Sequence, residues 1–189
     1  MVNKLFDKYG RWVEMLPLPV FLIYTRVVDP AISIDWLGPY LSASVVAILV
    51  VTLLLRFQQP INPIFIGINI YFWVGSIGLL CGLGGLNRWL GELQAAGMLL
   101  FIAVIGLCLS YVAPRGFVGV RLENTELQRR WSLMLVCIAA ACAYFSYQWV
   151  GNVWLSEVIP FVGLFSIAGI LRGRLLSGER ESQPDTNKS

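Results

Sequence analysis

The chain has 189 residues, of which 57% are hydrophobic and only 13% are charged, and its net charge is +3. A soluble domain of this size cannot bury so much apolar surface, so the composition indicates a protein that resides in lipid. The small, scattered positive charge argues against nucleic-acid binding, and the absence of His excludes an imidazole general base, a His-ligated metal and a His proton relay.

The first 16 residues predict an amphipathic helix. Apolar side chains recur at i, i+3, i+4 and i+7, and charged side chains lie between them. We expect this helix to lie along the inner membrane surface before the chain enters the bilayer at Pro17. No cleavage site typical of a secretory signal follows, so the segment should be retained.

Six apolar segments then follow, and a membrane crossing needs about 20 such residues. They are residues 13–34, 40–56, 63–83, 95–113, 132–150 and 154–171. The sequence therefore predicts an all-α, polytopic membrane protein with six transmembrane helices in one domain, residues 1–176. Residues 177–189 are polar, lack an apolar period and are expected to be a disordered tail.

The distribution of basic residues predicts the orientation of these spans. With both termini in the cytoplasm, the outer side holds only Arg26 and Arg88. The inner side then holds twelve basic residues: Lys4, Lys8, Arg11, Arg56, Arg115, Arg121, Arg129, Arg130, Arg172, Arg174, Arg180 and Lys188. The positive-inside rule favours this arrangement over five spans. We expect a bacterial inner membrane, and a eukaryotic inner membrane system is the alternative.

A short motif recurs at the predicted outer turns. Residues 87–93 (NRWLGEL) are echoed by residues 152–158 (NVWLSEV) and more weakly by 35–39 (DWLGP), which indicates three helical hairpins. One interpretation is an outer site built from the three turns. The other is interfacial anchoring by Trp with helix capping and acidic first turns. The candidate residues are Trp36, Trp89, Glu92, Trp154 and Glu157.

Few polar side chains lie at membrane depth, where they are costly. Arg26 and Asp29 can pair on one helix face. Depending on where the first span begins, they lie near the middle of the bilayer or close to its outer surface. Asn69 lies well inside the third span and is expected either to hydrogen-bond to a neighbouring helix or to line a polar pocket. These three residues are candidate functional groups.

Small residues at helical spacing predict close helix packing. Gly78 and Gly82 form a GxxxG pair in the third span, and Gly75 lies one turn earlier. Such residues let two helix backbones approach each other, within one bundle or between two subunits.

The longest predicted inner loop, residues 114–131, is basic. Arg121, Arg129 and Arg130 suit anionic headgroups or serve as an orientation signal, and Thr125 with Gln128 predicts a capping box. The loop resembles that of SdpI-type membrane immunity proteins at its Pro, aromatic, Gly, Arg, Thr and Trp positions: Pro114, Phe117, Gly119, Arg121, Thr125 and Trp131. That resemblance implies protection of a bacterial cell against a membrane-active toxin. Leu122 departs from the Thr that usually follows the Arg.

These features favour a non-enzymatic membrane protein with no catalytic, metal-binding or cofactor-binding residues. The first hypothesis is an accessory, assembly or immunity-type module that acts through a protein partner or as a homo-oligomer. The second is a small carrier or lipid-handling protein for an apolar substrate, since hairpin duplication is common in transporters. A membrane-embedded enzyme with a metal held by the outer acidic residues is the third, and no ligand spacing supports it. Membrane lipids are the expected surroundings.

Overall fold

The computed structural model describes residues 13–27 and 36–182, and nearly all of them are helical. In chain order the helices are α2 (Pro17–Val27), α3 (Leu37–Arg56), α4 (Pro63–Leu80), α5 (Gly84–Leu93), α6 (Ala95–Val112), α7 (Thr125–Gln148), the π-helical turn η1 (Trp154–Val158) and α8 (Ile159–Ser182). Five helices are long and apolar enough to cross a membrane, namely α3, α4, α6, α7 and η1 with α8. The predicted all-α membrane fold is confirmed at this level, and residues 13–25 form a shorter apolar helix.

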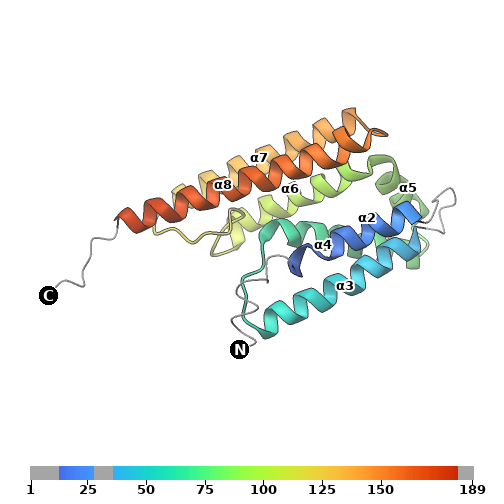
Figure 1. Ribbon diagram of the computed structural model, residues 1–189, viewed down its shortest axis with the longest axis horizontal. Coiled ribbons are helices and arrows are strands. Elements are labelled where there is room, and N and C mark those ends of the chain that lie inside the picture. The colour runs from blue at the N-terminus through green and yellow to red at the C-terminus, as the bar shows by residue number, and fades with distance from the viewer. Residues whose placement is uncertain (1–12, 28–35, 183–189) are drawn as a thin grey trace.

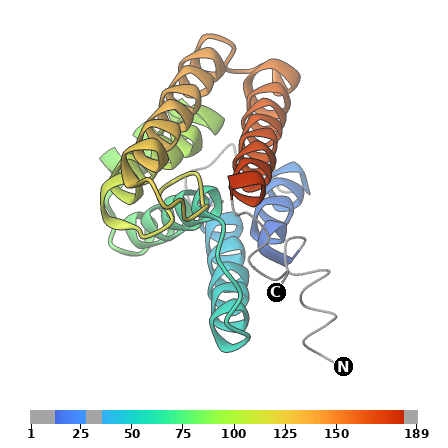
Figure 2. The same ribbon diagram turned by 90° about the vertical axis from the view of Figure 1, so that its left-hand side faces the viewer.

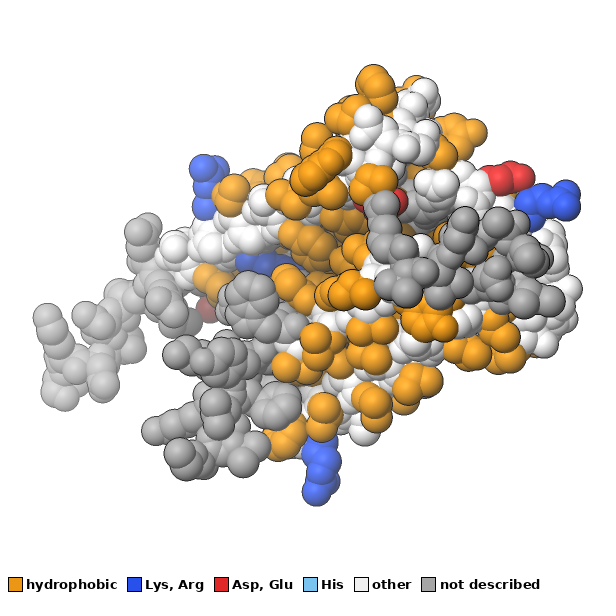
Figure 3. Space-filling view, turned by 45° about the vertical axis from the view of Figure 1, so that its right-hand side comes forward, with side chains coloured by type: hydrophobic (Ala, Val, Ile, Leu, Met, Phe, Trp, Pro, Cys, Tyr) orange, Lys and Arg blue, Asp and Glu red, His pale blue; other side chains and the backbone are white. Residues whose placement is uncertain are grey.

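Helix α4 lies at the centre of the bundle. It packs against α3 on one side and α6 on the other, while α2 packs on α3, α7 on α6, and α8 on α7. The long helices run roughly along the longest axis of the molecule (Figure 1), and in the view along this axis α3 lies on the opposite side of the bundle from α7 (Figure 2). Hydrophobic side chains are spread over the face of the bundle shown in Figure 3, as expected of a surface that faces lipid.

Local sequence explains where α4 and α7 begin. Pro63 occupies the first turn of α4, where its missing N–H costs nothing, and the Asn62 side chain caps the helix by accepting a hydrogen bond from Ile64 N–H. The cap of α7 is Asn124, which accepts from Leu127 N–H at 3.0 Å. The predicted Thr125–Gln128 capping box is therefore wrong, because Gln128 instead reaches back into the preceding loop.

Several boundaries differ from the predicted spans. α7 begins at Thr125 rather than near 132, because its first two turns are polar and hydropathy does not register them. α8 continues to Ser182, so residues 177–182 of the predicted tail are helical. Residues 84–93 form a separate short helix, α5, rather than the start of the return span. The N-terminal amphipathic segment up to residue 12, residues 28–34 of the first predicted span and residues 183–189 lie outside the described residues.

Candidate functional site

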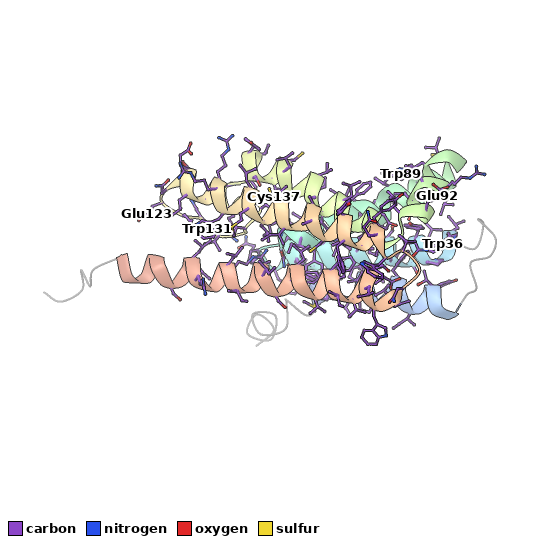
Figure 4. All side chains as sticks on the ribbon, turned by 90° about the horizontal axis from the view of Figure 1, so that it is seen from above. Trp36, Trp89, Glu92, Glu123, Trp131 and Cys137 are labelled. Atoms are coloured by element: carbon purple, nitrogen blue, oxygen red, sulfur yellow. The ribbon has the colours of Figure 1, made fainter. Side chains whose placement is uncertain are left out.

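The predicted outer turns gather at one end of the bundle. Figure 4 shows Trp36, Trp89 and Glu92 at this end, and Glu123 and Trp131 at the opposite end. We name these the outer end and the inner end, after the predicted orientation. Their side chains differ in exposure: Trp154 is 71% exposed and Trp89 44%, and Glu92 is exposed, whereas Trp36 and Glu157 are half-buried.

A cavity lies beneath these turns, between α2, η1, α8 and the junction of α5 with α6. Its volume is about 430 Å³, within the range of small-molecule sites. Each repeat contributes to its wall: Trp36 from the first turn, Gly91 from the second, and Ser156 with Glu157 from the third. The structure thus brings residues from all three copies of the motif to one cavity.

The cavity reaches the outside of the bundle between α2 and α8. Leu22 on α2 and Val162 on α8 both line it, and their side chains are 36% and 59% exposed. These two helices are not among the pairs that pack extensively against each other. A molecule that entered between them would come from the apolar surroundings of the bundle.

The back wall of the cavity holds a buried tyrosine pair. The hydroxyl groups of Tyr40 on α3 and Tyr71 on α4 lie 2.8 Å apart and hydrogen-bond to each other. Gly75 makes this possible, because any Cβ there would overlap the Tyr40 ring. Phe21 on α2 completes the wall, with its ring 5.1 Å from Tyr40 and 5.0 Å from Phe72.

The π-helical turn η1 shapes the opposite wall, and Pro160 explains its form. Proline has no N–H, so the Ser156 carbonyl lacks its ordinary helical donor four residues on. The Ser146 hydroxyl of α7 donates to this carbonyl instead, while Ile159 N–H bonds to Trp154 in the π pattern. Ser156 is among the residues that line the cavity and is only 1% exposed, and its buried hydroxyl has no hydrogen-bond partner among the described residues.

Gln94 forms the third edge of the cavity at the junction of α5 and α6. Its φ is +49°, a left-handed conformation that non-glycine residues seldom adopt and that costs on the order of 1–3 kcal/mol. The break at Gln94 lets α5 turn aside at the outer end, and Leu90 is buried below it. Backbone strain at the rim of a cavity is typical of functional sites.

The polar candidates in the predicted spans do not meet at this cavity. Asn69 is buried on α4 with its Oδ1 lacking a partner among the described residues, and it is not among the cavity's lining residues. Trp73 lies one turn later on α4. Its Nε1 is also buried and has no hydrogen-bond partner among the described residues. The Arg26 side chain and all of Asp29 lie outside what the structure describes.

The candidate packing glycines have different surroundings. Gly75 lies against Tyr40, and Gly78 lies against Asn87 of α5, whose Oδ1 would be 2.9 Å from an added Cβ. Gly82 instead follows the end of α4 with φ +68° and no atom within 4 Å of an added Cβ. The spacing missed Gly67, where a Cβ would be 2.7 Å from the Ile102 backbone of α6.

The basic inner loop is folded into the bundle rather than free in the headgroup region. Phe117 and Val118 are fully buried, with the Phe117 ring against Gly106 of α6. Gln128 and Ser132 on α7 hold the loop by accepting hydrogen bonds from the N–H groups of Leu122 and Val118, respectively. The arginines Arg121, Arg129 and Arg130 remain exposed, and Arg129 stacks over the Tyr111 ring at 3.9 Å.

A polar cluster that sequence reasoning missed lies at the inner end. Arg172 on α8 donates to Asn62 Oδ1 and to the Val118 carbonyl, both at 2.7 Å. The Asn62 N–H donates to Glu14 Oε1 at 3.1 Å, and Glu14 is only 5% exposed. The cluster thereby ties together the segment before α2, the α3–α4 loop, the α6–α7 loop and α8.

Comparison with protein-family models, characterised proteins and solved structures finds no match to this chain. The likeness of residues 114–131 to SdpI-type proteins therefore stays a prediction. No group of three or more metal-binding side chains occurs in the described residues. The outer cavity is the best-defined candidate site within them, because it combines a suitable volume, apolar walls and converging polar groups.

Proposed function

We propose that the protein is an integral membrane protein of the carrier or lipid-handling class, which binds a lipid-like molecule in the outer cavity. The observation that carries this proposal is the 430 Å³ cavity between α2 and α8, with exposed apolar side chains at its edge. Its walls are mainly hydrocarbon and aromatic ring, with a few hydroxyl, amide and carboxyl groups. Sites for small molecules are generally built in this way.

The proposed orientation has six crossings in three hairpins, with both termini in the cytoplasm of a bacterial cell. The twelve-to-two distribution of basic residues supports it. Consecutive helices also pack against each other along the chain, as short connections between crossings require, although the most extensive packing is between α6 and α7 of different proposed hairpins. Under this proposal the cavity lies in the outer half of the membrane, within reach of lipids in that leaflet.

An apolar cargo also suits the absence of acidic and basic residues along the cores of the long helices. No Asp, Glu, Lys or Arg occurs in residues 40–55, 63–80 or 95–112. Carriers driven by protons or sodium ions generally hold their coupling ion on polar groups at membrane depth. A lipid-like molecule that enters sideways needs no such groups, because it moves between two apolar environments.

The test uses a photoactivatable fatty alcohol in liposomes and compares two variants. Gly91 lines the cavity and has nothing within 4 Å of an added Cβ, so Gly91→Phe should direct a ring into this space. Gly163 on α8 also has open space, but it lies outside the cavity lining and serves as the matched control. We expect labelling of cavity peptides to fall about tenfold, equivalent to 1.4 kcal/mol of binding, in Gly91→Phe and to persist in Gly163→Phe. Equal labelling of both variants would contradict the proposal.

A second candidate function, a module that acts through a protein partner, is favoured by one observation on α8. Gly169 and Gly173 form an exposed small-xxx-small pair, and an added Cβ at either would meet no atom within 4 Å. Such a pair is typical of close contacts between membrane helices. An accessory or immunity-type protector would use this surface, and Gly169→Leu should then abolish a stable complex that Gly163→Leu leaves intact.

A further inference from the structure

We infer that the ligand of the outer cavity is a single-chain amphiphile, whose hydroxyl or carbonyl group hydrogen-bonds to Ser156 while its chain points toward the inner end. The inference rests on the proposed function and adds the class and orientation of the ligand. It is argued from three features of the cavity: one unpartnered hydroxyl, a polarity gradient and a limited volume.

Among the described residues that line the cavity, Ser156 has a buried hydroxyl without a hydrogen-bond partner. Ser156 as a whole is only 1% exposed. Its carbonyl, by contrast, is satisfied by Ser146. Buried polar groups are nearly always hydrogen-bonded, because leaving one unpaired forfeits its hydration without compensation. A ligand oxygen in the cavity supplies the missing partner.

The cavity is polar toward the outer end and apolar below. Along α2 the lining residues run from Thr25 down to Leu18. Along α6 they run from Gln94 down to Met98, and along η1 and α8 from Ser156 down to Val162. On α2, α6 and α8 the apolar lining residues Leu18, Met98 and Val162 thus lie nearer the inner end than the polar ones, while Val153 also lines the outer side and the paired tyrosines form the back wall. An amphiphile matches this gradient only with its polar end level with Ser156 and its chain below.

The volume indicates one chain rather than two. At 430 Å³ the cavity lies near the lower end of the range of about 300–1,000 Å³ typical of ligand sites. The aromatic side chains of Phe21 and Phe161 are among the residues that line it. A fatty alcohol or a monoacyl lipid suits this space better than a two-chain phospholipid.

The experiment measures competition in purified protein, with tetradecanol or tetradecane displacing a photoactivatable fatty alcohol. On the unmodified chain we expect tetradecanol to compete about tenfold better than tetradecane, as one hydrogen bond of about 1.4 kcal/mol requires. Ser156→Ala should remove this advantage and leave the potency of tetradecane unchanged. Ser166→Ala, an exposed position on α8 outside the lining, is the matched control and should behave like the unmodified chain.

The outcomes separate the two proposals. If neither compound displaces the probe, the proposed function itself fails. If both displace it equally well on the unmodified chain, or if Ser156→Ala weakens both equally, the cavity binds lipid but the inferred hydrogen bond is overturned. A diazirine at the end of the probe's chain should label peptides containing Leu18 and Met98. A diazirine beside its hydroxyl should label those containing Gln94 and Val153, and the reverse pattern would overturn the orientation.

Discussion

The guanidinium of Arg172 donates a hydrogen bond of 2.7 Å to the side chain of Asn62, although 110 positions separate the two residues. The same Asn62 side-chain oxygen also caps α4. The backbone N–H of Asn62 donates a hydrogen bond to the buried Glu14. One amide side chain therefore connects the start of the central helix to the last helix. This cluster fixes the inner end of the bundle, whereas the outer end holds the cavity.

Loss of the Arg172–Asn62 contact should destabilise the protein measurably. We expect Arg172→Gln to lower the free energy of unfolding by about 1.5–3 kcal/mol, because a charge-assisted hydrogen bond is lost in a partly buried position. Thermal unfolding in detergent, followed by Trp fluorescence, measures this. Arg174 is an exposed neighbour, so Arg174→Gln should change the free energy of unfolding by about 0.5 kcal/mol or less. If the effects of Arg172→Gln and Asn62→Ala simply add in the double variant, the two side chains are not coupled.

The bond between Ser146 and the Ser156 carbonyl should depend on Pro160. Ser146→Ala leaves that carbonyl without a donor and should cost about 1–3 kcal/mol of unfolding free energy. Pro160→Ala restores a backbone N–H four residues after Ser156, so the Ser146→Ala change should cost less in that background. Denaturation curves of the four proteins provide the test. An equal cost in both backgrounds would mean that the proline is not the reason for the bond.

The packing of the Tyr40 ring against α4 requires a glycine at position 75. Gly75→Ala places a Cβ inside the Tyr40 ring and should lower stability by about 1–3 kcal/mol through overpacking. Gly163→Ala meets no neighbouring atom and should be neutral or slightly stabilising, as expected in a helix. Melting temperatures of the two variants give the comparison. Equal values would show that the Tyr40 ring moves aside without cost.

The six-crossing orientation predicts which positions a membrane-impermeant thiol reagent can reach. In a background without the native cysteines, Lys4→Cys and Glu123→Cys should be labelled only from the cytoplasmic side, and Glu92→Cys only from the opposite side. Right-side-out and inverted vesicles provide the two sides. Labelling of Lys4→Cys from the outer side, with Glu123→Cys still labelled from the cytoplasm, would support five crossings instead.

Hydropathy predicted the helical membrane fold well because it depends on local composition. Long apolar runs such as 63–80 must form helices in lipid, where every backbone group needs an internal partner. The polar first turns of α7 and the extension of α8 to Ser182 were missed, because a hydropathy window ends where charged residues begin. The start of α7 at Thr125 is instead explained by the Asn124 cap.

The candidate site could be predicted only in part. The repeated Trp and acidic motif directed attention to the outer turns, and Trp36 and Glu157 do line one cavity. Its back wall, the Tyr40–Tyr71 pair, comes from the packing of separate helices and leaves no local pattern. Likewise, the GxxxG spacing predicts the same packing role for Gly78 and Gly82. In the structure Gly78 lies against Asn87, whereas Gly82 follows the end of α4.

The most direct measurement is native mass spectrometry of the protein extracted gently from its own membrane. We predict a small-molecule adduct of fatty-alcohol or monoacyl-lipid size on the 21.1 kDa chain, present in Gly163→Phe and absent in Gly91→Phe. A chain that carries no such adduct and instead retains a second protein would contradict the lipid-binding function and favour the partner-dependent module.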